Sequence, residues 1–159
     1  MRAPKREDYR PASLGPIDYL EFVSLLDIDA NRVDEYMLAA RDAPCYRASG
    51  DEAQAVARLW RELQVIDSSE QMRCHTPPVG LRLVTLEGAR IEASVCWRCW
   101  NVYGEDLHFA FNPKSKPAQG LLAHAKRVLP EAFSAYTQGR SPQQAGICPA
   151  HRLAAPAAC

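Results

Sequence analysis

Two neighbouring runs of the chain, residues 80–86 and 90–97, predict a β-hairpin. Side chains on a strand alternate between its two faces, so a shift of one residue in the pairing would move apolar side chains into water. Paired residue numbers that sum to 176 put one apolar set on one face: Leu81, Leu83, Thr85, Ile91, Ala93 and Val95. This pairing leaves a three-residue loop, 87–89, in which Gly88 supplies a positive φ. A sheet with one apolar face needs a covering layer.

Two other segments have the apolar period of an amphipathic helix. Residues 51–63 carry apolar side chains at helical spacing, and Ser49 with Glu52 forms a capping-box pattern before them. Ser115 can cap a second helix, which Pro130 would end. Both helices therefore have an apolar stripe that a sheet can bury.

The remaining apolar patterns are shorter. Residues 107–111 alternate as a strand does, 19–26 have helical spacing, and 32–40 favour a strand. These elements together predict an α+β fold, a two-layer sandwich of a mainly antiparallel sheet with two amphipathic helices on one face.

Length and charge restrict the classes of protein. A chain of 159 residues, 47% of them hydrophobic, suits one domain. We expect a disordered arm at 1–15, a single domain at 16–135 and a mobile Ala/Pro-rich tail at 136–159. Nineteen basic and nineteen acidic residues favour neither nucleic acid nor an anionic membrane. The charged start lacks the apolar stretch of a signal peptide, so we expect a cytoplasmic protein, with no prediction of its oligomeric state.

The chain's main chemical signal is a cysteine cluster at the open end of the predicted hairpin. Cys96 and Cys99 form a Cys-x-x-Cys pair, and Cys74 and His75 precede the first strand. Thiolates and imidazoles are the ligands that zinc prefers in structural sites. The sequence therefore predicts a structural zinc ion held by Cys74, His75, Cys96 and Cys99, although neighbouring side chains in an extended segment point apart.

Other interpretations of the cluster remain open. Cys96 and Cys99 could form a redox-active dithiol, with Arg98 favouring a thiolate and Cys74 as a third, resolving thiol, although no helix follows the pair. The cysteines could also be small buried hydrophobic residues. In the tail, Cys148 and His151 have a ligand-like spacing, but the surrounding sequence gives nothing to hold them in place. No catalytic constellation beyond the dithiol is present, so enzymatic activity stays undecided.

A third hypothesis concerns the second face of the hairpin. Arg82, Arg90 and Glu92 lie there beside Val84 and Leu86, a mixture that suits contact with a partner protein. The sequence therefore allows an interaction module that holds no metal.

The motifs around the cysteines resemble those of a known group. An Arg-Cys-His-x-Pro stretch at 73–77 is followed by Cys-Trp-x-Cys at 96–99. This combination resembles a group of small uncharacterised bacterial proteins, over about residues 49–129. The resemblance carries no known activity to transfer.

Overall fold

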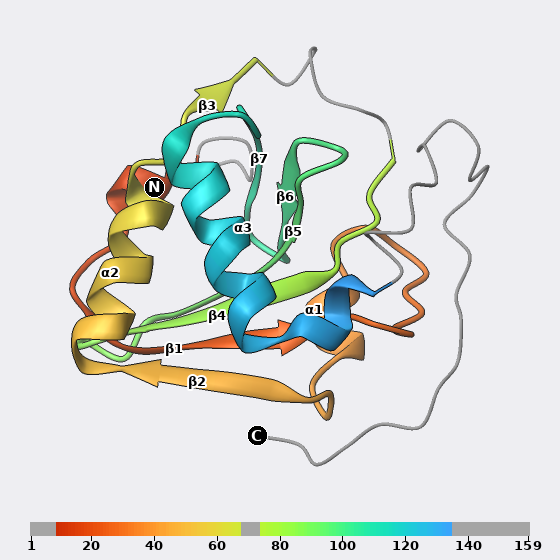
Figure 1. Cartoon of the computed structure of the whole chain (residues 1–159), viewed down its shortest axis with the longest axis horizontal. Coiled ribbons are helices and arrows are strands. Elements are labelled where there is room, and N and C mark those ends of the chain that lie inside the picture. The colour runs from red at the N-terminus through yellow and green to blue at the C-terminus, as the bar shows by residue number, and fades with distance from the viewer. Residues whose placement is uncertain (1–8, 68–73, 135–159) are drawn as a thin grey trace, which may run out of the picture.

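A seven-stranded sheet forms the framework of the molecule. The computed structural model describes residues 9–67 and 74–134. The strands are β1 (Ile17–Ser24), β2 (Cys45–Ser49), β3 (Val65–Ile66), β4 (Val79–Thr85), β5 (Arg90–Cys96), β6 (Asn101–Tyr103) and β7 (His108–Phe111). Their order is β2-β1-β4-β5-β6-β7-β3, with every neighbouring pair antiparallel (Figure 1).

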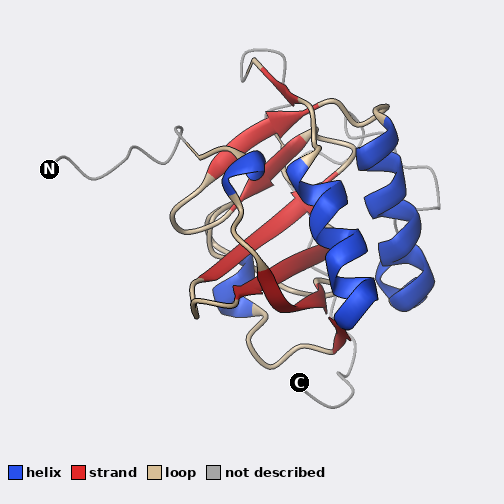
Figure 2. Cartoon of the chain, turned by 90° about the vertical axis from the view of Figure 1, so that its left-hand side faces the viewer, coloured by secondary structure: helices blue, strands red, loops and turns tan. Residues whose placement is uncertain are grey.

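Two helices, α2 (Gly50–Arg61) and α3 (Lys116–Val128), lie side by side on one face of this sheet, as Figure 2 shows. Their apolar stripes bury Trp60 and Leu121 completely. These side chains join a main core that includes Leu81 and Leu83 from the sheet. The predicted α+β sandwich, with two amphipathic helices on one face, is therefore confirmed.

The hairpin of β4 and β5 has the predicted faces but not the predicted register. Leu81 pairs with Ala93 and Leu83 with Ile91, so paired numbers sum to 174 rather than 176. The loop has three residues, as expected, but they are 86–88, closed by a hydrogen bond from the Thr85 amide to the Ala89 carbonyl. Gly88 has a φ of 84°, which confirms its role. A shift of two leaves every side chain on its predicted face, because faces alternate with period two.

Residues 17–24 form a strand where we predicted a helix. Leu20 and Phe22 pack under the helices, whereas Glu21 and Val23 are buried on the opposite face. Burial on both faces removes the apolar-polar alternation by which a strand is recognised in a sequence. The second neighbour of β1, the edge strand β2, was also not predicted.

The predicted strand at 32–40 is instead a turn and the short helix α1 (Tyr36–Ala39). A Cβ atom added at Gly80 would overlap Met37 of this helix, so α1 lies on the sheet face opposite Leu81. A small second core forms there; its buried members are Val23, Leu25, Met37, Ala40 and Ala43.

The helix starts and ends follow the predicted signals in part. Ser115 caps α3, accepting a hydrogen bond from the Ala118 amide, and Pro130 follows its end. Ser49 is the N-cap of α2 but makes no side-chain capping bond, and the Glu52 carboxylate contacts Tyr46 and His124.

Part of the predicted arm at 1–15 has a described structure. Within the predicted arm 1–15, Pro11–Ser13 form a 3-10 helix and Leu14 is buried. Tyr9 accepts a 3.1 Å hydrogen bond from the Trp60 indole. Residues 1–8 and the predicted tail at 136–159, with Cys148 and His151, lie outside the described residues.

Candidate functional site

The three cysteines Cys74, Cys96 and Cys99 meet where β5 turns into β6. Cys96 is the last residue of β5 and pairs with Asn101, the first residue of β6. The turn of residues 97–100 between them contains Trp100 at a φ of 59°, and it is tied to α3 by a hydrogen bond from the Trp97 indole to the Ala118 carbonyl. The segment before β4 brings Cys74 to this turn.

The sulfur atoms form a compact group, which we call the thiol cluster. Cys74 Sγ lies 2.9 Å from Cys99 Sγ. The Cys99 amide donates to Cys96 Sγ over 3.3 Å. The Thr76 hydroxyl lies 3.7 Å from Cys96 Sγ and 3.8 Å from Cys99 Sγ. Cys96 and Cys99 are fully buried, whereas Cys74 is half-buried, so Cys74 is the member of the cluster that solvent reaches.

Local hydrogen bonds separate the acidities of the two buried thiols. Burial raises the pKa of Cys96, but hydrogen bonds from Cys99 and Thr76 outweigh it and lower the pKa to about 6. A thiol at Cys96 could donate to the Thr76 carbonyl 3.4 Å away, a contact that the thiolate gives up. The hydrogen bond to Cys96, burial and the Cys96 charge all raise the pKa of Cys99. These shifts favour a thiolate at Cys96 beside a thiol at Cys99.

His75 points away from the sulfur atoms. Its Nδ1 lies 2.5 Å from Asn101 Oδ1 and its Nε2 lies 2.7 Å from Ser94 Oγ. Burial lowers the pKa of His75 to about 4, so the ring is neutral at pH 7. A neutral ring with hydrogen on Nδ1 donates to Asn101, while its Nε2 shares the one hydrogen of the Ser94 hydroxyl with the Tyr103 carbonyl, which lies 3.1 Å from Ser94 Oγ. Both ring nitrogens are thus engaged, so the predicted four-residue zinc set would require His75 to leave Asn101 and Ser94.

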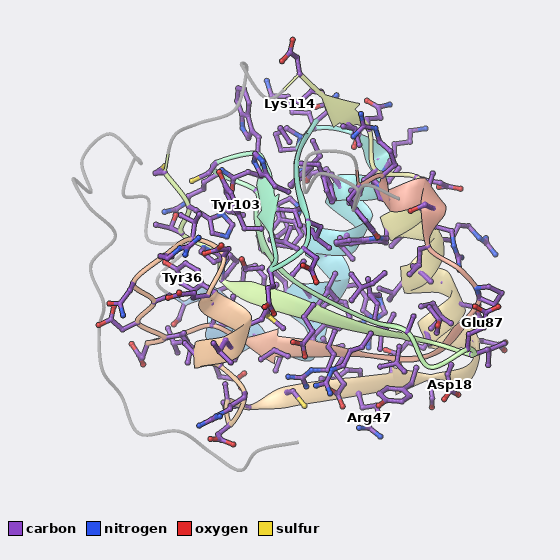
Figure 3. The ribbon with its side chains drawn as sticks, turned by 180° about the vertical axis from the view of Figure 1, so that it is seen from behind. Asp18, Tyr36, Arg47, Glu87, Tyr103 and Lys114 are labelled. Atoms are coloured by element: carbon purple, nitrogen blue, oxygen red, sulfur yellow. The ribbon has the colours of Figure 1, made fainter. Side chains whose placement is uncertain are left out.

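Aromatic rings enclose His75. Tyr36 of α1 and Tyr103 of β6 contact it edge to face, with ring centroids 5.5 Å and 4.8 Å away. His108 stacks on Tyr103 at 4.3 Å. Figure 3 shows Tyr36 and Tyr103 toward the left of the molecule and Glu87, in the hairpin loop, at its right-hand end. The thiol cluster and His75 therefore lie at the open end of the hairpin, as predicted.

Ser94, His75 and Asn101 reproduce the hydrogen-bonding order of a hydrolase triad. In such a triad the nucleophile contacts one ring nitrogen and an orienting group holds the other. Here the three side chains are at most 2% exposed, so Ser94 does not meet solvent. We interpret the arrangement as structural. Sequence reasoning missed Ser94 and Asn101, although their places, two residues from Cys96 and Cys99, are a signal that could have identified them.

The fit of the thiol cluster to a zinc ion is incomplete. Two thiolates on one tetrahedral zinc lie about 3.8 Å apart, given Zn–S bonds of about 2.3 Å. Cys74 and Cys99 are closer than this. In residues 9–67 and 74–134, no group of three or more His, Cys, Asp or Glu side chains is arranged to hold a metal ion. Zinc would require the sulfur atoms to separate.

The second face of the hairpin is occupied by ion pairs within the chain. Arg82 is buried and pairs with both Glu21 of β1 and Glu92 of β5. Arg47 of β2 pairs with Glu21, and Arg90 pairs with Glu92, so alternating charges cross four strands. Arg82 is therefore part of an internal network, which reduces what this face offers to a partner.

Comparisons with known proteins assign no family to the chain. No family model, curated protein or solved structure matches the chain. The resemblance to small bacterial proteins with the same cysteine motifs therefore stays a prediction. In the part of the chain that the structure describes, no helix has the length and apolar character required to cross a membrane.

Proposed function

We propose that this protein carries out thiol-disulfide exchange, with Cys74 and Cys99 as the redox pair. The distance of 2.9 Å between their sulfur atoms carries the proposal, because a disulfide forms once that distance closes to about 2.05 Å. The pair differs from the Cys-x-x-Cys dithiol expected from the sequence. Cys96 and Cys99 share a turn, but Cys74 is the thiol that solvent reaches.

The exchange proceeds in two balanced steps. The Cys74 thiol releases its proton to water, the resulting thiolate attacks one sulfur of a disulfide RSSR, the S–S bond breaks, and RS⁻ leaves and takes up a proton from water. The Cys99 sulfur then attacks Cys74 and gives its proton to the Cys96 thiolate, the second RS⁻ leaves and is protonated by water, and Cys96 returns its proton to water. The sum converts two protein thiols and RSSR into one protein disulfide and two RSH.

Cys96 provides a place for the proton of Cys99. Cys99 keeps its proton in the resting state because the Cys96 thiolate lies beside it. When Cys99 attacks, that proton can pass to Cys96, whose sulfur accepts hydrogen bonds from Cys99 and Thr76. Cys96 thus assists the second step without entering the disulfide.

The test uses glutathione disulfide as RSSR with metal-free protein. We expect a loss of two hydrogens in mass and a peptide crosslinked between Cys74 and Cys99. Cys99→Ser should accumulate a glutathione mixed disulfide on Cys74, since its resolving thiol is absent. Cys74→Ser should form neither product, and Cys96→Ser should still form the crosslink, more slowly. Failure of wild-type protein to form the Cys74–Cys99 crosslink would overturn the proposal.

A structural zinc ion is the second candidate. Its support is the convergence of three cysteines, and hydrogen bonds with Cys99 and Thr76 lower the pKa of one of them, Cys96. Cys74, Cys96 and Cys99 would hold the ion, without His75, and bound zinc would add folding energy. Elemental analysis of protein purified without a histidine tag should then find near-stoichiometric zinc, lost in Cys96→Ser. A metal content near zero with titratable thiols would reject this candidate.

The proposed thiol-disulfide exchange also bears on where the protein acts and on its partners. We propose the cytoplasm, because Cys74, Cys96 and Cys99 are free thiols, as a reducing compartment favours; Cys45, in contrast, is disulfide-bonded. The disulfide that reacts with Cys74 could belong to a partner protein, and we propose neither nucleic acid nor a membrane as a partner.

A further inference from the structure

We infer that Asn101 is a positioning residue that holds Cys74 against Cys99, an inference that rests on the proposed thiol-disulfide exchange. The Asn101 Nδ2 donates a 3.1 Å hydrogen bond to the Cys74 carbonyl. Its Oδ1 faces His75 Nδ1 at 2.5 Å. One carboxamide therefore fixes two consecutive residues of the segment that carries the accessible thiol.

The backbone of Asn101 is fixed to the other half of the thiol cluster. Asn101 pairs with Cys96 on one side and with Ala110 of β7 on the other. Asn101 thereby connects the sheet, through its backbone, to the Cys74 segment, through its side chain.

The orientation of the Asn101 side chain is in turn fixed by His75 and Ser94. Asn101 and Ser94 are completely buried, and Ser94 holds the far nitrogen of His75. The Ser94 hydroxyl also lies 3.1 Å from the Tyr103 carbonyl, within β6. The chain Ser94, His75, Asn101 therefore keeps the carboxamide nitrogen directed at the Cys74 carbonyl rather than rotating freely.

This arrangement has a consequence for the disulfide equilibrium. A thiol held close to its partner forms an intramolecular disulfide more readily, because its effective concentration is high. Loss of the Asn101 hydrogen bond lets the Cys74 segment move, so a larger fraction of the dithiol stays reduced at a given glutathione ratio. The net free-energy contribution of one hydrogen bond corresponds to roughly a two- to tenfold change in an equilibrium constant.

The experiment compares the equilibrium constant of the Cys74–Cys99 disulfide in glutathione buffers. Asn101→Asp keeps the size and the acceptor for His75 but removes the donor to Cys74. Asn101→Ser removes the same donor without adding charge and serves if the Asp variant does not fold. Asn112→Asp, the same substitution at a residue whose amide donates to Gln64 rather than to the Cys74 segment, is the matched control. Circular dichroism establishes that each variant is folded.

We expect a roughly two- to tenfold lower equilibrium constant in both Asn101 variants and a wild-type value in Asn112→Asp. Equal values in all the folded proteins would overturn the role of Asn101, and so would a change confined to Asn101→Asp, which would indicate charge rather than position. Absence of the disulfide in wild-type protein at every glutathione ratio would instead overturn the proposed function itself.

Discussion

His75 shows at the scale of one residue how burial decides chemistry. It follows Cys74 directly, yet its ring is 2% exposed and faces Ser94 and Asn101. Burial lowers the pKa of this imidazole to about 4, because the charged ring would lose its hydration. A residue type that often binds zinc or transfers protons serves here as a neutral connector.

This shift predicts a specific dependence of stability on pH. The folded-state pKa of His75 lies below the value near 6.5 of an unfolded histidine, so between these values the unfolded chain binds more protons. The contribution of neutral His75 to the free energy of unfolding is fully present above pH 6.5, and about 3 kcal/mol of it is lost as the pH drops to 4. Urea unfolding at several pH values should show this loss in wild type. His75→Gln should be less stable at pH 7 and show a much smaller slope; an identical slope would contradict the assignment.

At the scale of elements, α1 packs closely on the sheet because Gly80 of β4 has no side chain. A Cβ atom at Gly80 would lie 2.0 Å from Met37 Sδ and 3.2 Å from the Ala93 carbonyl oxygen. The lack of a Cβ at Gly80 thus lets a buried methionine lie flat on β4. This contact brings α1, with Tyr36, to the end of the sheet where His75 lies.

Substitution at this contact should show coupling between helix and strand. We expect Gly80→Ala to lower the free energy of unfolding by about 1–3 kcal/mol, because Met37 must move. In Met37→Ala, which alone costs about 2 kcal/mol, the same Gly80→Ala change should cost much less. Gly15→Ala, where the new Cβ meets no atom within 4 Å, is the control. Additive effects in a double-mutant cycle would show that the two residues do not compete for space.

At the scale of the whole molecule, the main core between the sheet and the two helices supplies the stability on which the site depends. Leu121 of α3 is fully buried in this core, whereas Leu38 of α1 is 68% exposed. Leu121→Ala should destabilise the protein by about 3 kcal/mol, and Leu38→Ala should change stability by less than about 0.5 kcal/mol. Denaturant unfolding followed by fluorescence measures both. Similar costs for the two substitutions would contradict this division of the core.

The sequence by itself determined the elements whose signal is local. The stripes of α2 and α3, the cap at Ser115 and the two faces of the hairpin depend only on residue spacing. The position of Cys96 and Cys99 at the open end of the hairpin followed from the same spacing, whereas Pro77 and Pro78 only permitted Cys74 to join them. These features were predictable because helix and strand periods decide which side chains share a face.

Only the tertiary structure decided the features that depend on neighbours distant in sequence. The strand β1 lost its alternation because both of its faces are buried, and the hairpin loop moved by one residue because the turn closes at Thr85 and Ala89. The assignment of His75 required Asn101, 26 residues away, to reach its ring. Local spacing places a side chain on a face, but its partner is set by packing and by the need to satisfy buried polar atoms, which only the folded chain specifies.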